Sequence, residues 1–200
     1  NVCIDGVLAL WAAPWAPAAL TYAERLIYFP LGVFATALGT VLLPTFARQA
    51  ACRREERMLQ TLAASVRNLM LIMIPAAVGL IVLAGPLVRL AFQWQGGLFD
   101  AESALFTTRA LLFYAPGLAV FSLYKVLVPV FYALKDTRTP VRVGVYAVAL
   151  NLALNVLFVL TWPAGYKHAG LALATVLASG FNCLMLAFLI QRRLGSPGWK

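Results

Sequence analysis

Two positions in this sequence place charged side chains inside long apolar stretches, where they could bind a polar ligand. Glu24 and Arg25 are adjacent in TYAERLIYFP, and Lys125 lies in FSLYKVLVPVFYALKD. A charged side chain at the centre of a membrane helix costs about 2.5–3.5 kcal/mol on insertion scales, so it usually faces a cavity or a partner group. We therefore consider Glu24, Arg25 and Lys125 candidate site residues.

The chemistry that Arg25 offers is recognition of phosphate. Its planar guanidinium donates two parallel hydrogen bonds to phosphate oxygens, which an ammonium group cannot match. The alternative is an arginine that extends its head to the membrane surface without binding a ligand, and the residues alone favour neither. Because neighbours along a helix point to different faces, Glu24 and Arg25 need not pair with each other.

Lys125 lies deep in its apolar stretch. About nine residues separate it from Leu134, which corresponds to about 13 Å along a helix and places Lys125 near mid-membrane. Its side chain should face a cavity or another helix. A structural pairing accounts for this position at least as well as contact with a ligand does.

The remaining reactive residue types predict neither a metal site nor an enzyme. Cys3, Cys52 and Cys183 are far apart and match no metal or disulfide spacing, so we expect free thiols. His168 has no cysteine or acidic cluster near it in the sequence. The sequence contains no P-loop, HExxH or GxSxG motif. We therefore expect no catalytic residues, no metal and no cofactor.

Composition indicates a membrane protein. The chain is 62% hydrophobic and only 12% charged, with a mean hydropathy of +0.85, whereas a soluble domain carries about 25% charged residues. A chain with so few charged residues must bury its exterior in lipid or in protein. The net charge of +9 could suggest nucleic acid, but cytoplasmic loops of membrane proteins also collect Lys and Arg. We expect no nucleic-acid partner.

The charged residues divide the chain into six apolar stretches, each near the length of about 20 residues that a membrane helix needs. We therefore predict an all-α, polytopic membrane protein with a bundle of six transmembrane helices. Because the chain opens with Asn1 and the first stretch looks truncated, we expect an internal fragment. The approximate spans are 6–23, 26–46, 68–88, 104–134, 143–162 and 169–191.

The connections between these spans predict an orientation. Segments 48–57 and 135–142 and the tail from 191 are basic, whereas 93–102 has acids without Lys or Arg, and 162–168 has a single Lys. Lys and Arg concentrate on the cytoplasmic side, so the three basic connections should lie there. Prolines within the spans should bend them, which is common in transporters but also in membrane helices generally.

Four stretches of this sequence resemble the MurJ (MviN) lipid II flippase family, within the multidrug/oligosaccharidyl-lipid/polysaccharide exporter superfamily. They are YAERLIYFPLGVFATALGTVLLPTFARQA at 22–50, IPAAVGLIVLAGPLVRLAFQ at 74–93, FYALKDTRTPVRV at 131–143 and HAGLALA at 168–174. The stretches are long, occur in the expected order and extend over nearly the whole chain.

The resemblance implies one lobe of a two-lobe transporter core. Members of the family have twelve core helices in two six-helix lobes, and residues 1–200 would be the second, C-terminal lobe. The N-terminal lobe is then the missing partner. The family moves lipid II, an undecaprenyl-diphosphate-linked peptidoglycan precursor, from the inner to the outer leaflet of the bacterial cytoplasmic membrane by alternating access, and so contributes to cell wall biogenesis. The expected partners are lipid II and membrane lipids.

The resemblance also implies roles for particular residues. Arg25 falls on an arginine that the family needs, and would bind the diphosphate head group. Glu24, Tyr28 and Lys125 are the other expected substrate-binding residues, although Tyr28 stands where some members carry an acid. The segment WAAPWAP at 11–17 replaces a stretch usually rich in Gly and Ser, so the bending of this helix could differ.

Three alternatives to a lipid II flippase stay open. A related exporter would carry other polyprenyl-linked glycans or drugs, and the stretch FYALKDTRTP favours the flippase instead. A non-transporting membrane scaffold would keep the fold, and loss of the cavity arginine would favour it, whereas Arg25 is present. A membrane-embedded glycosyltransferase would need clustered acidic residues near a membrane face, and the sequence has no such cluster.

Overall fold

The computed structural model describes residues 15–93, 99–163 and 166–194, and within these ranges the chain forms helices joined by short turns, with no strand. One short element is a π-helix, η1, inserted into a long helix between α2 and α3. The elements in chain order are α2 (Ala16–Pro30), η1 (Leu31–Thr36), α3 (Ala37–Ala51), α4 (Glu55–Val82), α5 (Ala84–Phe92), α6 (Ala101–Tyr114), α7 (Gly117–Ala133), α8 (Arg138–Thr161) and α9 (Lys167–Leu194).

Several of these helices are long and apolar enough to cross a membrane. Four stretches qualify, namely Ala16–Ala51, α4, α8 and α9, and a fifth is obtained if α6 and α7 count as one bent span. The predicted all-α membrane fold is therefore confirmed. Within the described residues the number of spans is four or five, where the sequence predicted six.

The predicted boundary around Glu24 and Arg25 is absent from the described residues, although part of the first predicted span lies outside them. Residues 16–23 share α2 with these two charged residues, and α2 continues through η1 into α3. Charge does not end a helix here because Glu and Arg are both good helix formers, and Pro17 lies in the first turn, where proline is tolerated. Residues 6–14 of the first predicted span lie outside the described residues.

The predicted span 104–134 is bent rather than straight. It consists of α6 and α7, which meet at an angle of 49°, and Pro116 precedes the first residue of α7. Proline has no N–H to donate and its ring clashes with the preceding turn, so it interrupts a helix at this point.

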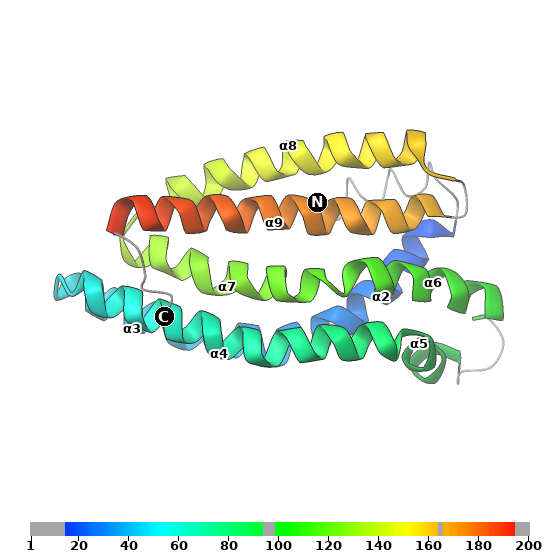
Figure 1. The fold of residues 1–200 in the computed structure, drawn as a ribbon, viewed down its shortest axis with the longest axis horizontal. Coiled ribbons are helices and arrows are strands. Elements are labelled where there is room, and N and C mark those ends of the chain that lie inside the picture. Colours follow the sequence, from blue (N-terminus) through cyan, green and yellow to red (C-terminus); the bar gives the residue numbers. More distant parts are fainter. Residues whose placement is uncertain (1–14, 94–98, 164–165, 195–200) are drawn as a thin grey trace.

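The long helices run side by side in an antiparallel bundle (Figure 1). The ends of α3, α7 and α9 and the start of α8 lie at one end of the bundle, together with the basic segments 48–57 and 135–142. The starts of α2, α6 and α9 lie at the opposite end, where the connection containing Asp100 is found. We call these the basic end and the outer end.

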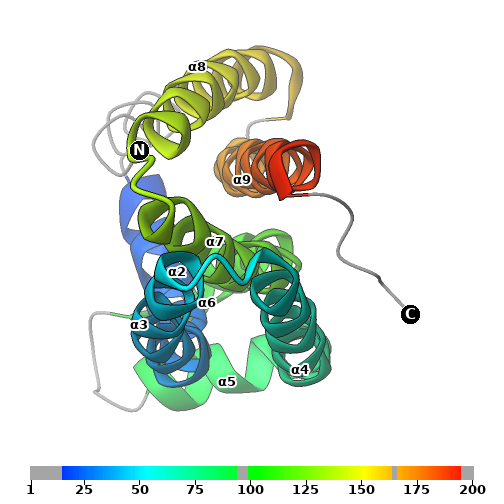
Figure 2. The same cartoon turned by 90° about the vertical axis from the view of Figure 1, so that its left-hand side faces the viewer.

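Helix α7 occupies the middle of the bundle. Seen along the helices, α8 and α9 lie on one side of α7 and the α2–α3 and α4 helices on the other (Figure 2), and α7 contacts α3, α4 and α9. Close packing against α3 is possible because Gly39 of α3 faces α7. A Cβ atom at Gly39 would lie 3.3 Å from the carbonyl oxygen of Lys125, so α3 and α7 approach closely at this level.

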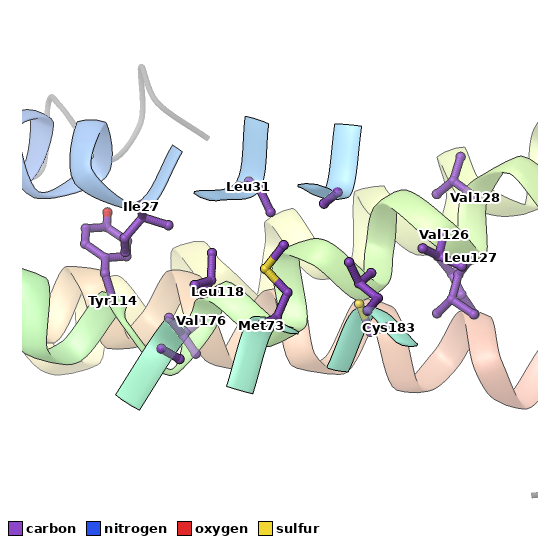
Figure 3. Close-up of a cluster of buried hydrophobic side chains, with 14 of the residues drawn as sticks. Ile27, Leu31, Met73, Tyr114, Leu118, Val126, Leu127, Val128, Val176 and Cys183 are labelled. Carbon is purple, nitrogen blue, oxygen red and sulfur yellow. The ribbon is translucent and has the colours of Figure 1, made fainter. Parts of the chain in front are cut away.

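The core is an apolar cluster around α7 (Figure 3). Ile27 and Leu31 reach it from the long first helix, Met73 from α4 and Cys183 from α9. Large apolar side chains on the outer surface are exposed, among them Phe29 at 75%. An exterior of this kind requires a lipid environment or a covering partner.

Candidate functional site

Helix α2 presents side chains to two separate cavities. Trp15, which precedes the helix, and Ala18, Tyr22 and Arg25 follow the three- and four-residue spacing of one helix face, and they line the first cavity. Glu24, Ile27, Tyr28 and Leu31, the last in η1, follow the same spacing on a different face and line the second cavity. The adjacent residues Glu24 and Arg25 therefore lie on different cavities, as expected for neighbours on a helix.

The first cavity, which we call the outer cavity, has a volume of about 780 Å³ and lies between α2, the end of α5 and the start of α6. Arg25 lies at this cavity, is exposed, and its guanidinium carbon lies 5.6 Å from the centre of the Tyr22 ring. This is within the range of a cation–π contact, which orients the cation without neutralising it. The guanidinium is therefore available to an anionic ligand.

Two carboxylates, Asp100 and Glu102, also line the outer cavity. Asp100 caps α6 by accepting a 2.8 Å hydrogen bond from the backbone N–H of Ser103. Hydrogen bonding from Ser103 lowers the pKa of the Asp100 carboxyl group, because the bond stabilises the charged form. Asp100 is thus negatively charged at neutral pH and is already engaged in the cap.

The second cavity, which we call the mid-bundle cavity, has a volume of about 330 Å³ and lies between α2, η1, the end of α6, α7 and α9. Three of the four predicted site residues, Glu24, Tyr28 and Lys125, line it together. Tyr28 is 55% exposed, whereas Glu24 and Lys125 are partly buried. The structure thus brings these three residues together and places Arg25 at the neighbouring cavity.

Each charged residue of the mid-bundle cavity has a polar partner. The hydroxyl of Tyr114 donates a 3.1 Å hydrogen bond to Glu24 Oε1, and Figure 3 shows this hydroxyl pointing toward α2. Lys125 Nζ donates a 3.1 Å hydrogen bond to Thr36 Oγ1 at the end of η1. Lys125 therefore links α7 to the π-helix and also lines a cavity. The two roles considered for Lys125 from the sequence, a structural pairing and contact with a ligand, are compatible with each other.

Sequence reasoning missed the contribution of α9 to this cavity. Thr175, Ser179 and Asn182 line it, and their spacing of four and three residues places them on one helix face. That spacing could have been recognised in the sequence, because three polar residues on one face of an apolar helix indicate a polar contact. Tyr114 and Tyr124, the two aromatic hydroxyls from α6 and α7, carry no comparable sequence signal.

Buried side-chain hydrogen bonds join α8 and α9 beside this cavity. Asn151 of α8 donates to Thr175 Oγ1 of α9 at 3.3 Å, and Asn155 donates to Asn151 Oδ1 at 3.1 Å. Both asparagines are fully buried. Such amide contacts join helices in an apolar environment, where an unsatisfied polar group is costly.

The histidine and cysteine side chains in the described residues form no metal or disulfide site. In the described part of the chain, no group of three or more His, Cys, Asp or Glu side chains could hold a metal ion. His168 is buried, and its Nε2 lies 3.2 Å from the Phe106 carbonyl oxygen. Cys52 is exposed and Cys183 buried, and both are free thiols, whereas Cys3 lies outside the described residues.

Comparison with known proteins identifies relatives over the whole chain. The family model described as Lipid II flippase MurJ matches residues 1–200. The chain is 36% identical to the probable lipid II flippase MurJ of Vibrio cholerae, over 93% of this chain and 34% of that protein. It is 34% identical to the lipid II flippase MurJ of Burkholderia cenocepacia, over 100% of this chain and 37% of that protein.

A solved structure of lipid II flippase MurJ in an inward closed conformation has the same fold. The TM-score is 0.77 at 27% sequence identity, over 95% of this chain and 40% of that one. The predicted resemblance is therefore confirmed. The chain spans about a third of the length of the curated relatives that it matches.

Proposed function

This chain belongs to the MurJ lipid II flippase family, and we propose that it forms one six-helix lobe of a two-lobe transporter in the bacterial cytoplasmic membrane. The full-length protein then moves lipid II from the inner to the outer leaflet, without breaking bonds in it, and so contributes to cell wall biogenesis. The two lobes alternate access to a site between them. The basic end of the bundle faces the cytoplasm.

The observation that carries this proposal is the placement of Arg25. It lies on an exposed face of a membrane helix and lines a cavity of about 780 Å³. Within the described ranges it forms no ion pair, since the salt bridge found there joins Arg193 and Asp136. An unpaired guanidinium on a membrane helix is costly where it contacts lipid, unless it serves a ligand or a pathway, and the diphosphate of lipid II is a ligand that matches its donor geometry.

The mid-bundle cavity supports the same function from the other face of α2. Glu24, Tyr28 and Lys125 line it, and together they offer an acceptor, a hydroxyl and a cation. We assign these residues to contacts with polar groups of the lipid head group as the head group passes α2. Lys125 then alternates between the ligand and Thr36, its partner in this structure.

The test uses the full-length protein in a strain that lacks its own flippase. We expect Arg25→Ala to abolish growth support, because losing a charged hydrogen-bond partner costs about 1.5–3 kcal/mol, or roughly ten- to hundredfold in affinity. We expect Arg25→Lys to be defective as well, since an ammonium group keeps the charge but loses the bidentate geometry.

Arg89 provides a matched control for this test. It is an exposed arginine of α5 at the same end of the bundle and is absent from the lining of the outer cavity, so Arg89→Ala should support growth. Membrane levels of all three variants are compared by immunoblot. Full growth support by Arg25→Ala at normal expression would contradict the assignment of Arg25 to the substrate.

A further inference from the structure

The outer cavity contains a group of aromatic side chains that binding of a diphosphate does not require. We call this group the aromatic wall. The rings come from α2 and the residue before it, from the end of α5, from the segment before α6 and from α6 itself. The aromatic wall consists of Trp15, Tyr22, Phe92, Phe99 and Phe106.

The rings of the aromatic wall are held in place by one another. Trp15 stacks on Phe106 with a centroid distance of 3.7 Å and an interplanar angle of 10°. Tyr22 packs against Phe92 at 4.7 Å and against Phe99 at 5.4 Å. Mutual packing of this kind fixes the ring orientations, so the wall is a pre-formed surface. Pre-formed aromatic surfaces with a few polar groups are typical of ligand sites.

Polar groups border the aromatic wall. Ser103 and Thr107 of α6 and the carboxylates of Asp100 and Glu102 line the same cavity. Thr107 is 1% exposed, and its Oγ1 has no hydrogen-bond partner within the described ranges, which is uncommon for a hydroxyl group in a helix. The cavity thus combines ring faces with hydroxyl groups and acceptor oxygens.

The charged residues that line the outer cavity favour one orientation of a bound ligand. Arg25, next to Tyr22 of the wall, attracts phosphate. Asp100 and Glu102 repel phosphate but accept hydrogen bonds from hydroxyl and amide groups. A ligand that carries a diphosphate at one end and neutral donors at the other therefore fits with its donors toward the two carboxylates.

We propose that the aromatic wall binds the saccharide portion of the lipid-linked substrate. A sugar ring presents C–H groups on its faces, which contact aromatic faces, and hydroxyl and amide groups at its edge, which the carboxylates and hydroxyls accept or donate to. A volume of about 780 Å³ lies within the range of about 300–1,000 Å³ found for small-molecule sites. The inference rests on the proposed function, since Arg25 supplies the diphosphate contact.

The experiment measures binding of two probes to the purified full-length protein in detergent. One probe is a short-chain polyprenyl diphosphate that carries an N-acetylated disaccharide, and the other is the same polyprenyl diphosphate without sugar. Because both probes share the lipid chain and the phosphates, a difference between them reports contact with the saccharide. We expect Trp15→Leu to weaken binding of the saccharide probe about tenfold, which corresponds to about 1.4 kcal/mol, and to leave the other probe unchanged.

A second variant and a control distinguish loss of saccharide binding from a folding defect. Phe99→Leu removes a ring from the other part of the wall and should have the same selective effect. Tyr166→Leu removes an aromatic residue from the same end of the bundle, where its ring contacts Arg109 and not the cavity, and should change neither affinity. Circular dichroism and the thermal midpoint of each variant check the fold.

The outcomes separate the two proposals. Equal weakening of both probes by Trp15→Leu would show that the wall contacts the lipid chain or supports the fold, and an unchanged affinity for both would show that the wall is not used. Either result would overturn the saccharide assignment while leaving Arg25 in place. If Arg25→Ala leaves both affinities unchanged, the proposed function itself fails.

Discussion

Replacement of Lys125 by methionine should abolish lipid II transport by the full-length protein while changing its stability little. The Lys125 ammonium group donates a 3.1 Å hydrogen bond to Thr36, and a bond from a charged donor contributes about 1.5–3 kcal/mol. Because Lys125 is only partly buried, screening reduces this contribution, and methionine also removes the cost of desolvating a charge. The opposed effects leave a net change of about 1 kcal/mol or less in the free energy of unfolding.

Thr36→Val separates the two roles of Lys125. This variant removes the hydroxyl partner in η1 but keeps the ammonium group that lines the mid-bundle cavity. We therefore expect Thr36→Val to support growth of a strain without its own flippase and Lys125→Met to fail, with both proteins at normal membrane levels. Equal loss of growth in the two variants would refute the reasoning, because Lys125 would then act by holding the π-helix and not by contacting the substrate.

Three further predictions test the orientation, the packing and the basic end. A membrane-impermeant maleimide should label Cys52, which is exposed in a basic connection, in inverted vesicles but not in intact cells; labelling of intact cells would reverse the orientation. Gly39→Ala should have a lower thermal midpoint than Gly32→Ala, because a Cβ atom at Gly39 would lie 3.3 Å from the backbone carbonyl oxygen of Lys125, whereas one at Gly32 meets nothing within 4 Å. Gly32→Ala should stabilise the protein by about 0.5–1 kcal/mol through helix propensity, and an equal gain for Gly39→Ala would contradict the close packing of α3 against α7. Hydrogen bonds from Thr139 lower the pKa of the Asp136 carboxyl group below its usual value of 3.8, so the charged carboxylate stabilises the basic end above pH 3.8 and this stabilisation is lost as the pH falls through the lowered pKa. Asp136→Asn should therefore speed proteolysis of the 135–142 segment at pH 7 but not at about pH 2. Equal proteolysis rates of the variant and the unchanged protein at pH 7 would show that the Asp136 contacts are not stabilising.

The membrane class and the alternation of basic connections could be predicted because both depend on composition along the chain. Apolar stretches of about 20 residues and clusters of Lys and Arg are properties of local sequence, and the structure places the basic segments 48–57 and 135–142 at one end of the bundle. No tertiary contact is needed for either conclusion. The same reasoning placed a boundary at Glu24 and Arg25, because it treated charge as the edge of a span.

The predicted boundary at Glu24 and Arg25 was wrong because a charged residue that is unfavourable in lipid is still favourable in a helix. Charge raises the cost of a residue in lipid but does not lower its helix propensity, so a helix continues through a charged pair when a cavity receives the side chains. The cavities are tertiary features, formed by α5, α6, α7 and α9 around α2. The aromatic wall was missed for the same reason, since Trp15 and Phe106 lie about ninety positions apart in the chain and stack only in the fold.

The surface of α2 that carries Arg25 supports the proposal that this chain packs against a second lobe. Thr21, Arg25, Tyr28 and Gly32, the last in η1, are all exposed, and their spacing of four, three and four residues places them along one stripe. A stripe with a guanidinium in contact with lipid would cost about 2.5–3.5 kcal/mol at the helix centre. That cost is avoided if the stripe faces an aqueous pathway closed by a second lobe. The outer and mid-bundle cavities adjoin the stripe from its two sides, since Arg25 lines the first and Tyr28 the second. In the proposed mechanism, a lipid head group that moves along the stripe would therefore pass from one set of polar contacts to the other.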